Sequence, residues 1–254
     1  MRWQALLLLA AAAGAEAAPE PSAEACLAQA RQAAPLRQQI TLITVAAGGE
    51  RRELQARWDR LQQGGLRAFR LQIDSPAALA GSRWLWREGA SAPGFWVYLP
   101  GARDRPRKVG AAGLAQSLFD TGLSPFDLKF LLDGLPAATV QALAAAEPSP
   151  GGRRQRLRLT PPSGPDQLYD RVDLLLDLDR CLVLNAELFG GVPWKQLEID
   201  ERRIERRGAG WWAPSATLQD LREQSLTYIR LTEPAGSAAL PASAFDPERF
   251  HRGP

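Results

Sequence analysis

The chain has 254 residues, of which 45% are hydrophobic and 23% charged, a globular composition long enough to bury a substantial core. The 31 Lys and Arg residues against 28 Asp and Glu residues give a net charge of +3, which argues against a nucleic-acid-binding protein. The only histidine is His251, and the only cysteines are Cys26 and Cys181. This composition argues against a His-rich or Cys-rich metal centre and against Ser-His-Asp catalysis.

The first residues have the three zones of a secretory signal peptide. A basic residue precedes an apolar run over residues 5–13, and Ala15 and Ala17 supply the small residues of a cleavage site. The run is too short to span a bilayer as a helix. We therefore expect cleavage after Ala17, so that residues 1–17 form a signal peptide and residues 18–254 form a single exported domain.

In an exported protein the two cysteines can form a disulfide, remain reduced or, for Cys26, carry a lipid. An oxidising compartment favours a disulfide between Cys26 and Cys181, which would tether the N-terminal segment to a distant strand. Both thiols could instead stay buried and reduced. Lipidation of Cys26 is a third alternative, and Glu24 disfavours it because a charge would then lie inside the lipobox.

One short helix followed by a series of strands is expected in the first part of the chain. Residues 21–33 fit an amphipathic helix with Ser22 as its N-cap. After this helix the apolar period changes to two, and Gly-rich turns separate the alternating segments. The segments are residues 40–45, 53–58, 69–73, 83–87 and 95–100. Five strands in succession indicate an antiparallel meander.

The pattern between residues 110 and 147 is helical or irregular, and this segment is expected to cover one side of the sheet. Strand patterns resume after a connector at residues 148–154, and one of them runs from Trp211 to Leu218. The other strand segments lie at residues 157–159, 172–176, 182–184, 197–199 and 226–231. We predict one mainly β domain in which helices close one side of a large curved antiparallel sheet.

The charged residues form no recognisable catalytic motif. A phosphate-binding loop, a nucleophile elbow and a zinc-protease motif are all missing from the sequence. Asp173, Asp177 and Asp179 fall on one side of a strand and could bind a cation, but a solvated face is the favoured interpretation. Arginine runs are interpreted mainly as charged edges that prevent strand pairing, and less favourably as contacts with a partner or an anionic lipid surface; they lie at residues 51–52, 153–156 and 202–207.

Aromatic residues are frequent, with eight tryptophans in the chain. Core packing is the favoured interpretation for any single one of them. Several nevertheless fall in the predicted strands, and a concave sheet face with large apolar side chains must be filled by a lid or by a ligand. A dry apolar cavity favours acyl chains, because each buried methylene contributes ~0.8 kcal/mol.

Short segments along the chain share their order with motifs of a known family. They are residues 95–100 with the basic residues that follow at 103–109, and residues 120–128, 169–172, 210–214 and 239–250. Together they resemble the periplasmic outer-membrane lipoprotein-sorting proteins, relatives of the carrier LolA. The resemblance spans roughly residues 40 to 251. At residues 118–121 and 124–126 the chain departs from the Gly-rich, Tyr-containing run of the family, so we expect a lid of different shape.

The resemblance implies an incomplete antiparallel β-barrel with a helical lid over an apolar cavity. It also implies a non-enzymatic periplasmic carrier, without cofactor or metal, that binds a lipid or the acyl chains of a lipoprotein for transport toward the outer membrane. An inner-membrane exporter of the resistance-nodulation-division type is an implied partner, and we expect a monomer that binds no nucleic acid. The alternative is a periplasmic sensor or adaptor of the same fold that binds an inner-membrane transporter or regulatory protein.

Apolar residues of the meander and of the covering segment are the expected ligand-binding residues. The concave wall is assigned to Phe69, Leu71, Trp84, Trp86, Phe95 and Val97, and the lid to Phe119, Leu123, Phe126, Phe130 and Leu131. A register error of one residue would exchange Phe95 and Val97 for Trp96 and Tyr98, because successive side chains of a strand point to opposite faces.

Overall fold

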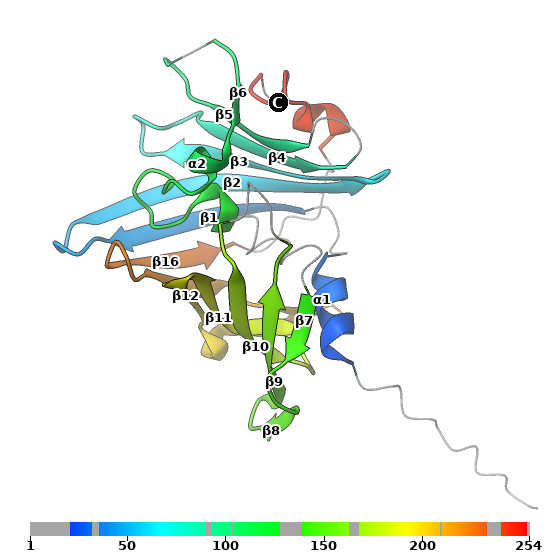
Figure 1. Ribbon diagram of the computed structural model, residues 1–254. Helices are drawn as coiled ribbons and strands as arrows, with labels where there is room; N and C mark the ends of the chain where they lie inside the picture. Colours follow the sequence, from blue (N-terminus) through cyan, green and yellow to red (C-terminus); the bar gives the residue numbers. More distant parts are fainter. Residues whose placement is uncertain are drawn as a thin grey trace, which may run out of the picture.

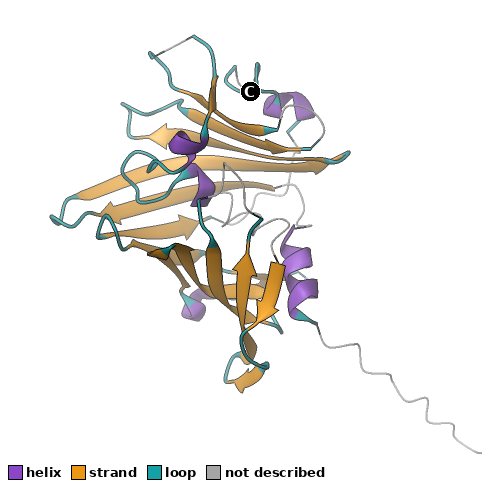
Figure 2. Ribbon diagram, viewed as in Figure 1, coloured by secondary structure: helices purple, strands orange, loops and turns teal. Residues whose placement is uncertain are grey.

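One antiparallel sheet of 14 strands carries most of the fold, and the described helices are few and short (Figure 2). The helical elements are α1 (Ala23–Arg31), α2 (Ala111–Leu114), and the 3-10 turns η1 (Glu201–Arg203) and η2 (Ala242–Phe245). The computed structural model describes residues 21–31, 36–89, 93–102, 104–127, 139–162, 168–208, 210–232 and 240–252. Within these ranges no helix has the length and apolar character needed to cross a membrane. The predicted signal peptide, residues 1–17, lies outside them.

The first half of the sheet is the meander that the alternating pattern predicted. Its strands are β1 (Leu36–Val45), β2 (Arg51–Gln63), β3 (Leu66–Ser75), β4 (Arg83–Glu88), β5 (Gly94–Tyr98) and β6 (Arg107–Val109). Each strand pairs with the next along the chain. The tight turn between β2 and β3 requires positive φ at Gly64 and Gly65, 57° and 78°, which glycine adopts without steric cost.

The second half of the sheet continues from the first through the pairing of β16 with β1. The order from that junction is β16, β15, β12, β11, β10, β9 and β7, with β8 paired to β9. These strands are β7 (Thr139–Ala142), β8 (Glu147–Ser149), β9 (Gly152–Thr160), β10 (Arg171–Asp177), β11 (Leu182–Gly190), β12 (Val192–Ile199), β15 (Ser215–Asp220) and β16 (Ser225–Leu231). The sheet ends at β6 and at β7 and is not closed into a barrel (Figure 1).

Three expectations about strand content were wrong. Residues 148–154, expected to form a connector, contain most of β8 and the start of β9. The pattern from Trp211 to Leu218 is not one strand, because Pro214 interrupts it just before β15 begins. The first part of that pattern, β14 (Gly210–Trp212), pairs with β13 (Glu205–Arg207) in a separate two-stranded sheet. In addition, β7 lies inside the segment expected to be helical or irregular, since four residues are too few to show a period of two.

The N-terminal helix is tethered to the second half of the sheet. Ser22 caps α1 as predicted, and its Oγ accepts a hydrogen bond from the backbone N–H of Ala25 at 3.1 Å. Cys26 of α1 forms a disulfide with Cys181 in the turn between β10 and β11. The structure thus contains the bridged alternative, and neither a reduced nor a lipidated Cys26.

Apolar side chains are buried on both faces of the first half of the sheet. Trp96 packs with Leu85 on the outer face, where the C-terminal residues Phe245 and Phe250 cover them. The other face of the same strands belongs to the main core, which contains Phe95 and its neighbours. Phe95 and Val97 therefore lie on the side of the main core, as preferred from the sequence, and Trp96 lies on the outer face. The C-terminal segment explains why this outer face is also apolar.

Candidate functional site

The residues assigned to the concave wall form one continuous apolar surface across three strands. They lie in two cross-strand rows, Phe69, Trp86 and Phe95 in one row and Leu71, Trp84 and Val97 in the other. The rings of Phe69 and Trp86 stack with their centroids 5.6 Å apart. Each of the six residues is at most 6% exposed. The wall is therefore covered by other parts of the protein.

Helix α2 and the segment that follows it form one of these covers. Four of its residues belong to the same buried cluster as the wall, namely Leu114, Leu118, Leu123 and Phe126. The ring of Phe119 meets Trp84 edge-on, with centroids 4.8 Å apart. Figure 1 shows α2 and the loop after it in front of β2 and β3. We call residues 111–127 the lid segment; Phe130 and Leu131 lie outside the described residues.

The lid segment turns sharply where it reaches the wall. Phe119 and Asp120 have φ values of 50° and 58°, in the left-handed region that bulky residues rarely adopt. Two backbone hydrogen bonds hold this turn: the N–H of Leu118 donates to the carbonyl of Leu123 at 2.6 Å, and the N–H of Thr121 donates to that of Leu118 at 3.0 Å. The constrained turn places the ring of Phe119 on Trp84.

A buried group of charges fastens the lid segment to the second half of the sheet. Lys195 of β12 donates through Nζ to Asp127 at 2.5 Å and to the carbonyl of Gly122 at 2.6 Å. Its Nζ also lies 3.6 Å from a carboxylate oxygen of Asp220 in β15. The Tyr169 hydroxyl donates to the second oxygen of Asp127. We call Lys195, Asp127, Asp220 and Tyr169 the Lys195 cluster.

Every side chain of the Lys195 cluster is nearly inaccessible to solvent. The exposed fraction of the side chain is 7% for Lys195, 2% for Asp127 and 8% for Asp220. Burial raises the pKa of Tyr169, and the negative charge of Asp127 raises it further. Tyr169 therefore remains a hydrogen-bond donor, and the cluster resembles the fully bonded polar networks that specify one arrangement of a core.

Asp127 has a second role in the local structure of the lid segment. Its carboxylate accepts a hydrogen bond from the backbone N–H of Ser124 at 2.6 Å, and the Ser124 Oγ accepts one from the N–H of Asp127 at 3.1 Å. This reciprocal pairing is a capping box, with Pro125 at the first helical position. The departure from the family motif at these residues therefore builds the start of a helical turn.

Threonine side chains attach the lid segment to the middle of the sheet. The carbonyl of Thr121 accepts hydrogen bonds from the Oγ1 of Thr44 in β1, at 3.2 Å, and from the Oγ1 of Thr227 in β16. The two hydroxyl groups also lie 2.8 Å from each other. At the surface, Arg52 of β2 forms an ion pair with Asp120. The lid segment is thus held mainly by polar contacts on one side and packs against apolar side chains on the other.

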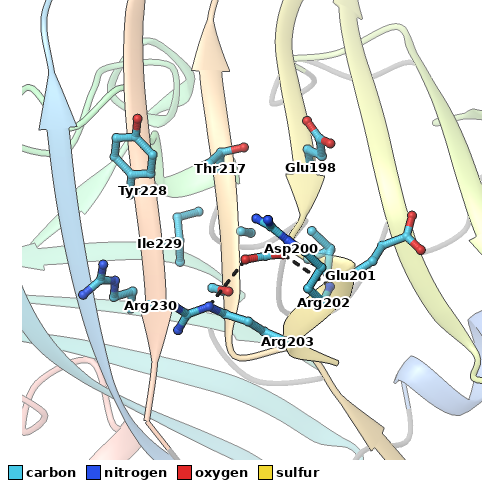
Figure 3. A pocket seen from close by; sticks show the side chains of 12 residues that line it. Glu198, Asp200, Glu201, Arg202, Arg203, Thr217, Tyr228, Ile229 and Arg230 are labelled. Carbon is cyan, nitrogen blue, oxygen red and sulfur yellow. Dashed lines mark hydrogen bonds and ion pairs between the residues drawn. The ribbon is translucent and has the colours of Figure 1, made fainter. Parts of the chain in front are cut away.

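Among the described residues, two surface hollows lie close to the elements named above. The first, about 410 Å³, lies beside the contact of Phe119 with the wall and is lined by Arg52, Glu53, Leu54, Pro76, Leu79, Phe119, Asp120 and Thr121. The second, about 540 Å³, is bordered by β12, β15, β16 and η1. Figure 3 shows Arg202 and Arg203 there, both in ion pairs with Asp200. Only the first hollow adjoins the predicted wall and lid.

The three aspartates considered as a cation site do not converge. Asp173 accepts hydrogen bonds from Arg158 and Asp179 accepts them from Arg153, and these bonds lower the pKa of both carboxyl groups. Asp177 is fully buried and accepts backbone N–H groups of the turn after β10, so a solvated position is wrong for this residue. Among the described residues no group of three or more His, Cys, Asp and Glu side chains could hold a metal ion.

The sequence reasoning missed the Lys195 cluster, although a signal for it was present. Lys195 precedes the buried Leu197 by two positions, and Asp220 follows the buried Leu218 by two. In a strand such residues share one face, so charged side chains occupy the apolar face of β12 and β15. A charge at a core-facing position indicates a buried partner.

The architecture places the protein in a known structural class. A DUF1329 family protein from Desulfovibrio piger has a similar fold, with a TM-score of 0.76 and 20% identity over 87% of this chain and 92% of that chain. A LolA superfamily protein from Nitrosomonas europaea is similar with a TM-score of 0.70 and 16% identity over 88% of this chain and 97% of that chain. A domain from Vibrio parahaemolyticus, described as a proposed outer membrane lipoprotein-sorting protein, has a TM-score of 0.75 and 16% identity over 88% of this chain and 94% of that chain. The fold of the chain is similar to that of a LolA superfamily protein and of a lipoprotein-sorting domain, so the resemblance of the sequence motifs is confirmed at the level of the fold.

Sequence comparison adds a family but no function. A family model described as "Uncharacterized protein" matches residues 66–252, and the chain belongs to this family. No curated protein matches the chain. The matched region covers the concave wall, the lid segment and the Lys195 cluster.

Proposed function

We propose that the protein is a periplasmic carrier that shields a lipid, or the acyl chains of a lipoprotein, against the concave wall during transport toward the outer membrane. The observation that carries the proposal is the apolar wall of β3, β4 and β5, covered by a lid segment that is fastened elsewhere by polar contacts. Such a lid can leave the wall as one unit. The fold shared with lipoprotein-sorting domains supports the same function.

The disulfide and the fold support a location outside the cytoplasm. A structural disulfide is typical of proteins outside the cytoplasm, where oxidising conditions preserve it. We place the protein in the periplasm, as the predicted signal peptide also suggests. There it would act as a monomer without cofactor or catalysis, and it would exchange its cargo with an inner-membrane partner such as an exporter of the resistance-nodulation-division type.

An acyl chain can replace the lid segment against the wall. Releasing the lid segment separates Asp127 from Lys195 and uncovers the apolar contacts between lid and wall. An acyl chain on the same surface restores apolar burial there, at ~0.8 kcal/mol for each buried methylene group. The hollow beside Phe119 gives such a chain a place to enter, next to the contact between Phe119 and Trp84.

Two tryptophans of neighbouring strands provide a matched test. Trp84 in β4 faces the wall side and Trp96 in β5 faces the outer side, and they are 6% and 9% exposed. Replacing either by Ala removes a large buried ring, so both variants should lose stability. Only Trp84→Ala removes part of the proposed binding surface.

The measurement is the binding of dansyl-labelled undecanoic acid to the mature protein, followed by dansyl fluorescence. We expect Trp84→Ala to weaken binding about tenfold or more, since a large buried side chain contributes about 1.5–3 kcal/mol, and Trp96→Ala to change it by less than about twofold. Equal effects of the two variants would refute the assignment of the wall. A wild-type protein that binds no acyl probe would refute the carrier and favour the sensor or adaptor.

A further inference from the structure

Arginine and tryptophan side chains gather at one end of the second half of the sheet. The Arg154 side chain at the start of β9 forms an ion pair with Glu201 of η1 at 2.5 Å. The Arg180 guanidinium in the turn after β10 lies 5.0 Å from the ring centre of Trp211 in β14. Arg153 at the start of β9 also forms an ion pair with Asp179, in the turn after β10, at 3.0 Å. Together these contacts join the start of β9, the turn after β10, η1 and the hairpin β13–β14. We call this region the Arg-Trp surface; it consists of Arg153, Arg154, Arg180, Arg202, Arg203, Arg206, Arg207, Trp211 and Trp212.

The Arg-Trp surface presents positive charge to the solvent. It contains seven arginines against five carboxylates, an excess of two positive charges. The carboxylates of Asp177, Asp179, Asp200, Glu201 and Glu205 form ion pairs with six of the arginines, and Asp200 serves both Arg202 and Arg203. The side chains of Arg202 and Arg203 are 91% and 62% exposed. Guanidinium groups in such positions can bind phosphate oxygens in pairs of hydrogen bonds.

The tryptophans lie within this basic surface. Trp211 is 37% exposed and is directly opposite Arg206 in the pairing of β13 with β14. The guanidinium of Arg207 lies 4.9 Å from the ring centre of Trp212. An indole ring has an apolar body and one polar N–H, which suits the boundary between lipid headgroups and acyl chains.

Protection of sheet edges accounts for only part of this arrangement. Arg206 and Arg207 lie on β13, an edge strand of its own two-stranded sheet, but Arg180, Arg202 and Arg203 lie in a turn and in η1, outside any strand. Arg202 and Arg203 pair with Asp200, yet most of each side chain stays exposed. A ligand with many negative charges would engage these exposed guanidinium groups.

We propose that the Arg-Trp surface docks the protein onto an anionic lipid bilayer. The arginines bind lipid phosphates, and the ring of Trp211 enters the headgroup region. The hollow beside Phe119 borders Arg52 and lies at the opposite end of the sheet. The start of β16 lies beside Val45 and Arg51, near this hollow, whereas its end pairs with Ser215, near η1. Docking therefore leaves this hollow accessible, and it is separable from acyl-chain binding.

The test is co-flotation of the full-length mature protein with vesicles of phosphatidylcholine alone or mixed equally with phosphatidylglycerol. We expect binding to the mixed vesicles only, with loss of binding at high salt because salt screens surface charges. The double variant Arg206→Glu/Arg207→Glu should weaken binding about 20-fold or more, since each basic residue near an anionic surface contributes about fivefold. Trp211→Ala should remove the blue shift of tryptophan fluorescence on mixed vesicles.

Matched controls lie at other parts of the molecule. Arg105→Glu/Arg107→Glu reverses two exposed charges before and in β6, and Val192→Ala truncates an apolar side chain that is 60% exposed at the opposite end of β12. Neither should change vesicle binding by more than about twofold. A wild-type protein that stays unbound at low salt, or equal losses in both charge-reversal variants, would overturn the proposal. Binding of dansyl-labelled undecanoic acid should survive in the Arg206→Glu/Arg207→Glu variant, which separates this result from the proposed carrier function.

Discussion

Replacement of Lys195 by Met tests whether the buried charges hold the lid segment. Methionine keeps most of the side-chain length but removes the charge and the three donors. Asp127 and Asp220 would then remain buried as carboxylates without their cation, and the carbonyl of Gly122 would lose its donor at 2.6 Å. Breaking a buried ion pair on one side costs about 3–5 kcal/mol, and we expect this loss in the free energy of unfolding.

The assay is urea unfolding followed by circular dichroism, together with amide hydrogen exchange of the lid segment. Lys195→Met should accelerate exchange at Leu118 and Leu123 before it affects the central strands, because the lost contacts are those of the lid. The double variant Lys195→Met/Asp127→Asn should recover part of the stability by removing one buried charge. Arg202→Met is the control, since its ion pair with Asp200 is exposed and screened by solvent, so its loss should leave the urea midpoint nearly unchanged. A loss below about 1 kcal/mol in Lys195→Met would refute the reasoning.

Two further predictions concern the ends of the chain. Replacing Cys26 and Cys181 by Ser should lower the free energy of unfolding by about 2–5 kcal/mol, since the bridge closes a loop between residues 155 positions apart; an unchanged urea midpoint would contradict this. Burial lowers the pKa of His251, and the neighbouring Arg252 lowers it further, so the folded state disfavours the imidazolium. Above the unfolded pKa of 6.5, His251 is neutral in both states and the stability is at its full value. As the pH falls below 6.5 toward the lower pKa of the folded state, the unfolded state binds the proton more tightly, and the free energy of unfolding decreases. Proton NMR titration of this single histidine should give a midpoint below 6.5, and a midpoint at or above it would contradict the packing against Tyr98.

The strands could be predicted because their information is local. Alternation of apolar and polar residues identifies β1 to β5 and most of β9 to β16, and glycines identify the tight turns. The hairpin β13–β14 could not be separated from β15 in this way, since Trp211, Trp212 and Leu218 fit one apolar pattern. The distinction depends on Pro214 and on which strand each segment pairs with.

The polar attachment of the lid segment depends on contacts between distant positions. Asp127 and Lys195 are 68 residues apart, and Thr44 and Thr227 are 183 residues apart. Single-sequence periodicity can place Lys195 on the apolar face of a strand, but it cannot name the partner. The partner is determined by the strand order, which brings β12, β15, β16 and β1 side by side under the lid.

The two faces of the meander illustrate the same limit. Trp84 and Trp96 both occur in alternating strands and both are buried. Trp96 is covered by the C-terminal residues Phe245 and Phe250, whereas Trp84 meets Phe119 of the lid segment. Alternation predicts that the two rings face opposite sides, and only the fold shows which side the lid covers.

Native mass spectrometry of the mature protein, purified from a periplasmic fraction without detergent, tests the central claim most directly. Organic extraction of the same sample identifies any bound molecule. We predict a near-stoichiometric lipid or acylated peptide in the wild-type protein, lost in Trp84→Ala and retained in Trp96→Ala. A wild-type protein that is empty in the periplasmic fraction would contradict the carrier function.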